Sequence, residues 1–450
     1  MLPPLTFDAD DNPWGKAMPR FICVLLVFAL VPMAASSQVG IAFEFSFSNP
    51  GARSMGFGGA FVALADDATA AFANPAGLVQ LAAPEVSLEV RHWSYSTPFT
   101  QSGRLTGQPT GVGLDTEPGV RRSSFDNDLT GLSFLSFVYP KENWSIAFYH
   151  HLLADFEANF ETQGLFAEGP GPLSTFRLND RRDRTKFEIV TYGLSAAFKI
   201  LENLSLGLGL TYFDGLLEGR QNHYLWDEDS LEGYFGPTSF LPERFVQGSE
   251  FTAEGSDLRF NAGLLWRLAD TWSLGSFYRQ GPGFELEFSF IGGPASDDPD
   301  IPPGARHSFT NPIDYPDVYG AGLAYRSPGG RLTLSFEWDH IEYSTIFESL
   351  GETASGEFIP DGDELHLGGE YAFLGSQPLF ALRAGIWRDP NHQVESDLDN
   401  EFIEGLTGLG ADELHYAIGC GVALKKFQLD LAADFSERQD TISISAIYSW

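Results

Sequence analysis

Apolar and polar residues alternate with a period of two along most of the chain, which is the spacing of side chains on the two faces of a β-strand. In the longest run, residues 144–161, every even position except His150 is apolar, and the odd positions become polar toward the end. Shorter runs occur at 257–268 and 332–339. The pattern predicts strands longer than the usual length of about 3–10 residues. In the longest strand, it places all even positions up to Phe160 on one apolar face.

Periodicity alone does not distinguish a soluble sandwich, whose apolar face points into a core, from an outer-membrane barrel, whose apolar face points at lipid. The connections distinguish them, because such barrels alternate short periplasmic turns with long outer loops. Tight turns are predicted at 140–143, 202–203, 269–271, 327–330, 375–377 and 425–426. Long polar stretches lie between them, at 96–128, 163–183, 219–255, 291–316, 346–362 and 389–410. The sequence therefore predicts an all-β fold, an antiparallel transmembrane β-barrel.

About fourteen strands fit this pattern, and an even number brings both ends of the barrel to the periplasmic side. We place them near 85–95, 129–139, 144–162, 184–199, 204–218, 256–268, 272–290, 317–326, 331–345, 363–374, 378–388, 411–424, 427–437 and 441–450. Because an open sheet edge is not stable in lipid, the sheet has to close. The last strand alternates up to Trp450 and resembles the C-terminal strand that the outer-membrane barrel assembly machinery recognises.

Residues 1–37 are predicted to be a signal peptide for export. The apolar run 21–35 follows Arg20, precedes small residues suited to signal peptidase, and is too short to span a bilayer comfortably. Met18 is a possible true start, because the residues before it are acidic. The mature chain then has Cys420 as its single cysteine, which suits an exported protein that does not depend on disulfides.

Composition and motifs exclude several classes of function. The chain has 61 Asp and Glu against 27 Lys and Arg, a net charge of -34, so its surface is unsuited to nucleic acid. No His-Glu-x-x-His, Gly-x-Ser-x-Gly or paired-cysteine motif is present. His150 and His151 point to opposite faces of one strand and cannot chelate one ion together. We therefore expect no enzyme activity, no cofactor and no metal site.

The most specific motif precedes the first strand, in residues 49–78. The residues alone indicate a glycine-rich turn and then an alanine-rich helix from about Asp66 to Phe72, which Asn74 and the following proline end. Asp66 and Asp67 would lie at the N-terminus of that helix, where free N–H groups favour carboxylates. A phosphate-binding loop is excluded, because no Lys-Ser or Lys-Thr pair follows the glycines.

This segment resembles the N-terminal hatch of the FadL-type family of outer-membrane transporters for long-chain fatty acids and hydrocarbons. The family's Asn-Pro-Ala element is matched by Asn74, Pro75 and Ala76, and its glycine-rich stretch by residues 51–60, which precede the acidic pair. The resemblance covers most of the mature chain except the outer loops, and continues at 337–344, 365–371, 382–387 and 415–433. Barrel proteins of the type IX secretion system share the motif, so it does not specify a substrate.

The resemblance implies a monomeric barrel, residues 85–450, in the outer membrane of a Gram-negative-type bacterium, with residues 38–84 folded inside it as a plug or hatch. Hydrophobic small molecules would be captured by the outer loops and released when the plug shifts, with outer-membrane lipid as the surroundings. The plug residues that gating would involve are Arg53, Gly56, Gly58, Gly59, Asp66, Asp67, Asn74, Pro75, Ala76 and Gly77. Contacts between plug and wall are the alternative role for these residues.

Two sets of residues on the expected lumen face are candidate substrate contacts. Arg259 and Arg267 could bind a substrate carboxylate or pair with the plug. Leu153, Leu265 and Ile341 interrupt the polar face, and could form an apolar pocket or pack against the plug.

Gly281, Pro282 and Gly283 interrupt the seventh strand, where proline cannot donate to the ladder. This kink could open a side exit into the bilayer, or the strand could leave the membrane at Gly281 and continue as an outer hairpin. The FadL-type family is thought to have its side exit at the third strand. The third strand here, 144–162, contains no Gly or Pro, and its regular pattern argues against an opening there.

These observations favour an outer-membrane transporter that takes up long-chain fatty acids or other hydrophobic compounds by diffusion through a plugged barrel. Two alternatives remain open. A scaffold or attachment protein in protein secretion would have a capped lumen without ligand and outer loops that bind another protein. A porin is disfavoured because the plug would block the pore.

Overall fold

The computed structural model describes residues 47–169, 175–226, 231–296, 298–299, 301–350, 357–396 and 410–450. The predicted signal peptide lies outside these residues. Within the described ranges, no helix combines the length and the apolar character that crossing a lipid bilayer requires.

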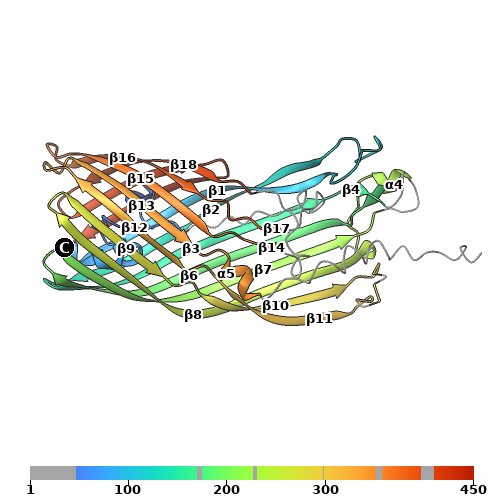
Figure 1. Cartoon of the computed structure of the whole chain (residues 1–450), viewed down its shortest axis with the longest axis horizontal. Helices are drawn as coiled ribbons and strands as arrows, with labels where there is room; N and C mark the ends of the chain where they lie inside the picture. Colours follow the sequence, from blue (N-terminus) through green and yellow to red (C-terminus); the bar gives the residue numbers. More distant parts are fainter. Residues whose placement is uncertain are drawn as a thin grey trace, which may run out of the picture.

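Fourteen antiparallel strand positions form one closed barrel (Figure 1), which confirms the predicted fold class. In chain order they are β1 (Glu85–Arg104), β2 (Val120–Pro140), β3 (Trp144–Thr162), β6 (Asp180–Leu201), β7 (Leu204–Tyr224), β8 (Phe245–Ala269), β9 with β10 (Trp272–Arg279 and Gly283–Gly292), β11 with β12 (Arg306–Asp314 and Val318–Arg326), β13 (Leu332–Ile341), β15 (Gly362–Phe373), β16 (Leu379–Asp389), β18 (Glu413–Ala423), β19 (Phe427–Phe435) and β20 (Gln439–Ser449). Pairing of β1 with β20, from Glu85↔Ser449 to Tyr95↔Gln439, closes the sheet.

The remaining elements are short. They are α2 (Ala52–Gly56), α3 (Ala70–Ala73), η1 (Pro75–Gln80), β4 (Leu165–Glu168), β5 (Thr175–Arg177), α4 (Leu231–Phe235), η2 (Pro242–Arg244), α5 (Thr345–Ser349), β14 (Glu357–Phe358) and β17 (Glu395–Ser396). The first three precede the barrel in the chain, and the others belong to its loops.

The alternation along the strands gives the barrel an apolar exterior. Large apolar side chains are exposed around the wall, among them Leu194, Leu208, Phe336, Leu367, Ile418 and Leu431. Neighbouring positions that point inward carry small polar residues such as Ser195, Ser205 and Ser335. An apolar outer face with a polar inner face is typical of a barrel that is surrounded by lipid.

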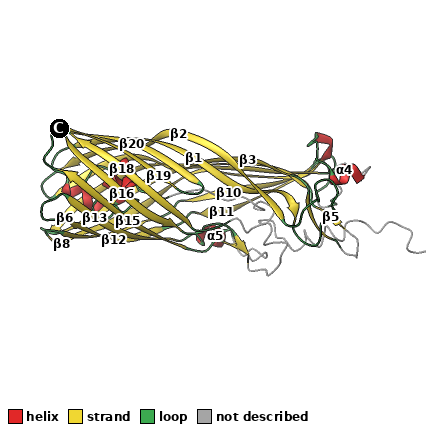
Figure 2. Cartoon of the chain, turned by 90° about the horizontal axis from the view of Figure 1, so that it is seen from above, coloured by secondary structure: helices red, strands yellow, loops and turns green. Residues whose placement is uncertain are grey.

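The wall is much taller on one side than on the other. β1 to β3 and β6 to β8 contain 19 to 25 residues each, whereas β13, β15, β16 and β18 to β20 contain 9 to 12. Figures 1 and 2 show the long strands extending beyond the short ones, at the end of the barrel opposite the C-terminus. The hairpin of β10 and β11 pairs with β8 and widens this extension.

The prediction that one apolar face runs through the whole third strand is wrong. A register shift between Leu152 and Ala154 inserts one residue into β3. Before the shift in the chain, the odd positions such as Tyr149 point inward. After it, the even positions Phe156 and Phe160 are buried inside. A one-residue bulge exchanges the two faces of a strand, because side chains alternate with a period of two.

The third strand is also not regular in its pairing, contrary to the sequence prediction. The ladder between β2 and β3 joins only Phe134–Pro140 to Ser145–His151, although both strands continue outward. The bulge in β3 begins directly after this ladder ends. Neither glycine nor proline marks the position, because the irregularity arises from pairing with β6.

In the seventh strand, residues 280–282 separate β9 from β10. β8 pairs with β9 through Asn261–Ala269 and with β10 through Gln247–Thr252, so residues 253–260 of β8 belong to neither ladder. Beyond the break, β10 continues as a hairpin with β11, as the second arrangement requires, while departure from the membrane at Gly281 and a side exit both stay predictions.

Residues 47–84, here called the plug, lie within the barrel. Figure 2 shows short helices enclosed by the strands near the end that carries the C-terminus. α2 contacts β18 and β19, and η1 contacts β6, β7 and β8. The predicted helix over 66–72 is only the single turn α3, Ala70–Ala73. Asp67 accepts hydrogen bonds from the Thr69 amide and hydroxyl instead, and this local competition shortens the helix.

Candidate functional site: the plug and the lumen beyond it

Asn74 connects two parts of the plug to the wall. Its Oδ1 accepts a hydrogen bond from the amide of Ala76 at 3.1 Å, and its Nδ2 donates to the carbonyl of Val62 at 2.9 Å. The same Nδ2 donates to the carbonyl of Leu264 in β8 at 3.1 Å. Pro75 then starts η1 with Asn74 as its N-cap. The Asn-Pro-Ala element is therefore a buried junction of three chain segments.

Two wall glycines form the seat of this junction. Gly207 in β7 and Gly263 in β8 lie opposite each other in the ladder. A Cβ atom on Gly207 would lie 2.2 Å from the amide nitrogen of Ala76, and one on Gly263 would lie 2.1 Å from Oδ1 of Asn74. The plug backbone reaches the wall here only because no side chain stands between them.

The predicted charged residues of the plug form one network with the wall. Arg53 Nη1 lies 2.5 Å from Asp66 and 3.2 Å from Asp67, and its Nε lies 3.6 Å from Glu370 of β15. Arg326 at the end of β12 binds Asp66 at 2.8 Å. Burial acts to raise the pKa of Asp66, but the charges of Arg53 and Arg326 outweigh it and hold that pKa below its ordinary value. Burial raises the pKa of Asp67 despite the nearby Arg53.

The predicted plug glycines make close backbone contacts. Gly58 and Gly59 have φ of 63° and 84°, a left-handed conformation that other residues rarely adopt. Gly56 faces Gly419 of β18, and a Cβ on Gly77 would lie 2.1 Å from the carbonyl oxygen of Ala65. These contacts match the alternative role in plug-to-wall packing, and gating by these residues stays a prediction.

Inward carboxylates of the wall bind plug amides. Glu89 of β1 accepts a hydrogen bond from the amide of Gly51 at 2.9 Å, and Glu337 of β13 accepts one from Val62 at 2.7 Å. On β15, the ring of His366 lies 2.8 Å from the carbonyl oxygen of Gly58. The plug is thus attached on several sides of the wall.

Beyond the plug, the inner wall is apolar and largely aromatic. We call this buried group the aromatic lumen cluster: Phe156, Ala158, Phe187, Ile189, Phe213, Phe251, Ala253, Phe284, Leu286, Phe288, Ile313 and Tyr315. Rings of Phe187 and Tyr315 stack with centroids 5.4 Å apart, and Tyr315 also meets Phe284 edge-on at 5.6 Å. Leu153 packs both against this cluster and against the core cluster that the plug forms with the wall, which places the two clusters next to each other.

A small cavity borders the plug inside the barrel. A cavity of about 20 Å³ lies beside Arg91, Trp93, His151 and Leu153, which is room for about one water molecule. A hydrophobic molecule larger than water could occupy this cavity only by displacing the side chains that line it.

The two predicted arginines do not come together. Arg259 Nε lies 2.5 Å from Asp257, whose carboxylate also accepts a hydrogen bond from the Gly283 amide at the break in the seventh strand. Arg267 donates to the carbonyl of Glu202 at 2.6 Å, in the turn between β6 and β7. Eight residues of strand, roughly 27 Å, separate them, so a single carboxylate cannot contact both.

The three predicted apolar pocket residues also lie apart. Ile341 is fully buried in a cluster that contains Val62 of the plug, whereas Leu153 lies between the aromatic lumen cluster and the core cluster that the plug forms with the wall. Leu265 is buried beside Ser205, which binds the carbonyl of Ala76. Their contacts match the alternative role of packing against the plug, and a substrate pocket made of these residues stays a prediction.

Sequence reasoning missed the aromatic lumen cluster and the inward carboxylates. Phe156 and Phe160 looked lipid-facing because nothing in the sequence marks the bulge. The sequence did contain a signal for the carboxylates on β13. Glu337 and Asp339 lie on the polar face of this strand, and that face was expected to line the lumen.

Comparison with known proteins shows which solved structures have a similar fold. No protein-family model and no curated protein sequence matches the chain. A solved FadL homologue from Pseudomonas aeruginosa is similar in structure, with a TM-score of 0.62 and 16% sequence identity over 91% of this chain and 99% of that one.

Two further solved structures are similar at lower scores. The CymD monoaromatic hydrocarbon channel has a TM-score of 0.52 at 14% identity, covering 90% of this chain and 99% of that chain. The deltaS2 mutant of the TodX monoaromatic hydrocarbon channel also has 0.52, at 15% identity over 90% and 100%. The protein is therefore a fourteen-stranded β-barrel that resembles bacterial outer-membrane channels. More particularly, it has the fold of FadL-like hydrophobic compound channels, as the motif in the plug led us to expect.

Proposed function

We propose that the protein is an outer-membrane channel through which hydrophobic compounds, such as long-chain fatty acids or hydrocarbons, diffuse into the cell past the plug. The aromatic lumen cluster is the observation that carries this proposal. Transfer of an apolar solute from water onto an apolar surface is favourable by about 25 cal/mol per Å², so such a lining concentrates apolar solutes. A pore for polar solutes would gain nothing from it.

The surroundings of the cluster support the same function. The apolar exterior fits an outer-membrane location, and two structures of similar fold are monoaromatic hydrocarbon channels. Arg259 is bound by Asp257 and Arg91 by Glu89 at 2.7 Å, so a substrate carboxylate would have to displace an internal one. Within the proposed class, this favours uncharged hydrocarbons over fatty acids.

The test is uptake of radiolabelled toluene and oleate by cells that carry the barrel. Leu286 in the cluster is 3% exposed, and burial of a leucine contributes about 1.5–3 kcal/mol. Leu286→Asn should therefore slow toluene uptake by about tenfold or more. Leu231→Asn makes the same chemical change on α4, where the side chain is 77% exposed, and should leave uptake unchanged.

Mass spectrometry of molecules that co-purify with the folded barrel is the second measurement. Enrichment of apolar molecules over an identically prepared porin supports the channel. Equal uptake by both variants, together with an empty lumen and a co-purifying exported protein, would instead favour the secretion scaffold.

A further inference from the structure

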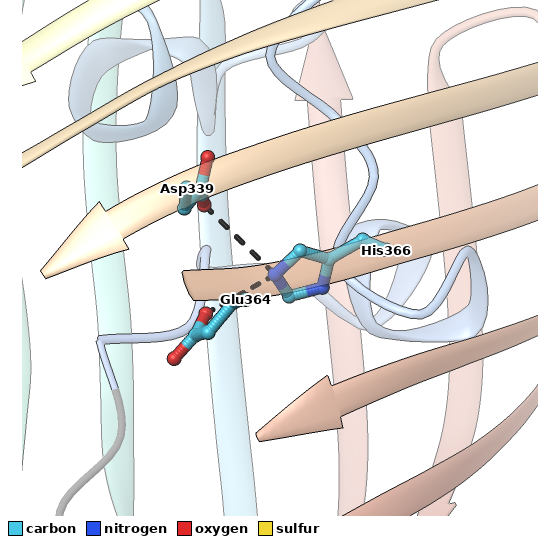
Figure 3. A group of neighbouring side chains, drawn as sticks. All are labelled: Asp339, Glu364 and His366. Atoms are coloured by element: carbon cyan, nitrogen blue, oxygen red, sulfur yellow. Dashed lines mark hydrogen bonds and ion pairs between the residues drawn. The ribbon is translucent and has the colours of Figure 1, made fainter. Parts of the chain in front are cut away.

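Three metal-ligating side chains converge on the inner wall beside the plug. Asp339 of β13 and Glu364 of β15 lie directly opposite each other in the ladder, and His366 lies two residues further along β15. All three are 5% exposed, and their ligand atoms lie within 4.8 Å of one another. Figure 3 shows the imidazole of His366 facing both carboxylates. Like charges directly opposite in a ladder repel each other, so this pair requires a positive partner.

The plug determines which ring nitrogen of His366 faces the carboxylates. Nδ1 lies 2.8 Å from the carbonyl oxygen of Gly58, which can only accept a hydrogen bond, so Nδ1 carries a proton. Nε2 is the atom that lies 3.1 Å from Glu364 Oε2 and 3.9 Å from Asp339 Oδ2. A histidine that binds a metal through one nitrogen usually donates its other N–H to a carbonyl or carboxylate in this way.

Asp339 supplies the second, independent observation. Its Oδ1 has no hydrogen-bond partner although the residue is more than nine-tenths buried, and its Oδ2 is beyond hydrogen-bonding distance from Nε2. A buried carboxylate oxygen without a hydrogen bond is unfavourable. Glu337, by contrast, already accepts hydrogen bonds from the Val62 amide and from Asn49.

Carboxyl groups outnumber guanidinium groups near Nε2. Glu337, Asp339 and Glu364 carry three negative charges when ionised, and Arg279, which lies over the rings of Phe72 and Phe277, carries one positive charge. A divalent cation with a neutral imidazole would neutralise the group. One nitrogen and two carboxylate oxygens suit zinc and related transition metals better than Ca²⁺ or Mg²⁺, which prefer oxygen alone.

The distances fit such an ion. Zinc binds nitrogen and oxygen at about 2.0–2.2 Å, which places neighbouring ligand atoms of a tetrahedral site roughly 3.4 Å apart. The N–O separations of 3.1 and 3.9 Å lie on either side of that value.

We propose that Asp339, Glu364 and His366 form a site for a divalent transition-metal ion of the zinc class, with a water molecule as fourth ligand, at the junction of the barrel wall and the plug. The ion fixes the ring of His366 with Nδ1–H toward Gly58. A Cβ on Gly59 would lie 2.8 Å from Nδ1, so the same ring lies against the plug backbone at two residues. Metal binding therefore stabilises the attachment of the plug to β15.

Zinc content of the folded barrel tests the proposal. The full chain, folded in detergent without a polyhistidine tag and with Cys420 replaced by serine, is stripped with EDTA and then dialysed against Zn²⁺. Elemental mass spectrometry should find about one zinc per barrel. Asp339→Asn and His366→Gln should each weaken zinc binding by at least about tenfold. Heat-dependent gel mobility verifies that each variant is folded.

The chain offers a matched control on the other side of the same two strands. His340 Nδ1 lies 2.9 Å from Asp363 Oδ1, and these side chains are 21% and 56% exposed. His340→Gln should bind zinc as the unchanged protein does. A zinc content below about one-tenth of an equivalent, or equal affinity in Asp339→Asn, would overturn the site and leave a proton on Nε2 as the positive partner.

Amide hydrogen exchange tests the role in plug attachment. Zinc should slow exchange in the plug segment around Gly58 and Gly59 in the unchanged protein but not in His366→Gln. Stoichiometric zinc binding without this protection would overturn the role in attachment.

Discussion

At the scale of single residues, the plug is attached by side chains that bind main-chain groups. The single side chain of Asn74 accepts a hydrogen bond from the amide of Ala76 and donates to the carbonyls of Val62 and Leu264. Short loops cannot satisfy their own buried backbone groups, so each such group needs a partner from elsewhere. The Asn-Pro-Ala motif of the plug therefore has a structural role that does not depend on any substrate.

Asn74→Ala should loosen the plug without unfolding the barrel. The change leaves buried backbone groups unpaired, which costs about 1–3 kcal/mol, and amide exchange in residues 47–84 should accelerate accordingly. Asn203→Ala is the control, because Asn203 also donates to a carbonyl, that of Arg267, but in the exposed turn between β6 and β7. Unchanged exchange in the plug of Asn74→Ala would contradict this account.

At the scale of elements, one inserted residue in β3 brings the outer half of this strand into the aromatic lumen cluster. The register shift at Leu152 to Ala154 turns Phe156, Ala158 and Phe160 from the outer face to the inner face. The polar residues between them turn outward, where the long strands extend beyond the short ones and meet water. The same shift coincides with the end of the ladder between β2 and β3.

Cysteine labelling tests the exchange of faces. In a Cys420→Ser background, Asn159→Cys should react with a membrane-impermeant maleimide on intact cells, because position 159 is exposed. Ala158→Cys should be protected, because Ala158 is fully buried in the lumen. Strong labelling at 158 with protection at 159 would show that the bulge is absent.

At the scale of the whole molecule, the closed barrel and its plug act as two bodies in contact. The strands close through β1 and β20, so the wall is continuous at the level of the plug. The cavity beside the plug has room for about one water molecule, so an apolar solute could pass there only if side chains or the plug moved. We therefore expect movement of the plug to open a path through the barrel.

A disulfide between plug and wall tests this movement. A Cβ on Gly56 would lie 3.2 Å from Cα of Gly419, and one on Gly419 would lie 3.1 Å from Cα of Gly56, so the two backbones are in direct contact and need to separate slightly to hold a disulfide. Gly56→Cys with Gly419→Cys, in the Cys420→Ser background, should slow toluene uptake at least about tenfold when oxidised and recover on reduction. Each single substitution is the control. Undiminished uptake by the oxidised form would favour an exit through the wall.

The sequence by itself determined the fold class, the number of strands and the position of the plug motif. Period-two patterns and the alternation of short and long connections are local properties of the sequence, so they can be recognised without knowing which strands pair. The apolar exterior followed from the same patterns. The predicted end of a helix at Asn74 was also correct, because proline at the next position is a local signal.

Only the tertiary structure decided which face of β3 lines the lumen, and which wall residues meet the plug. The bulge depends on the register with β6, and the seat at Gly207 and Gly263 depends on two strands that lie opposite each other. The group of Asp339, Glu364 and His366 joins different strands, so no spacing along the chain signals it, and the sequence predicted no metal site. Contacts between residues far apart in sequence arise from strand register and barrel closure, which are properties of the whole sheet.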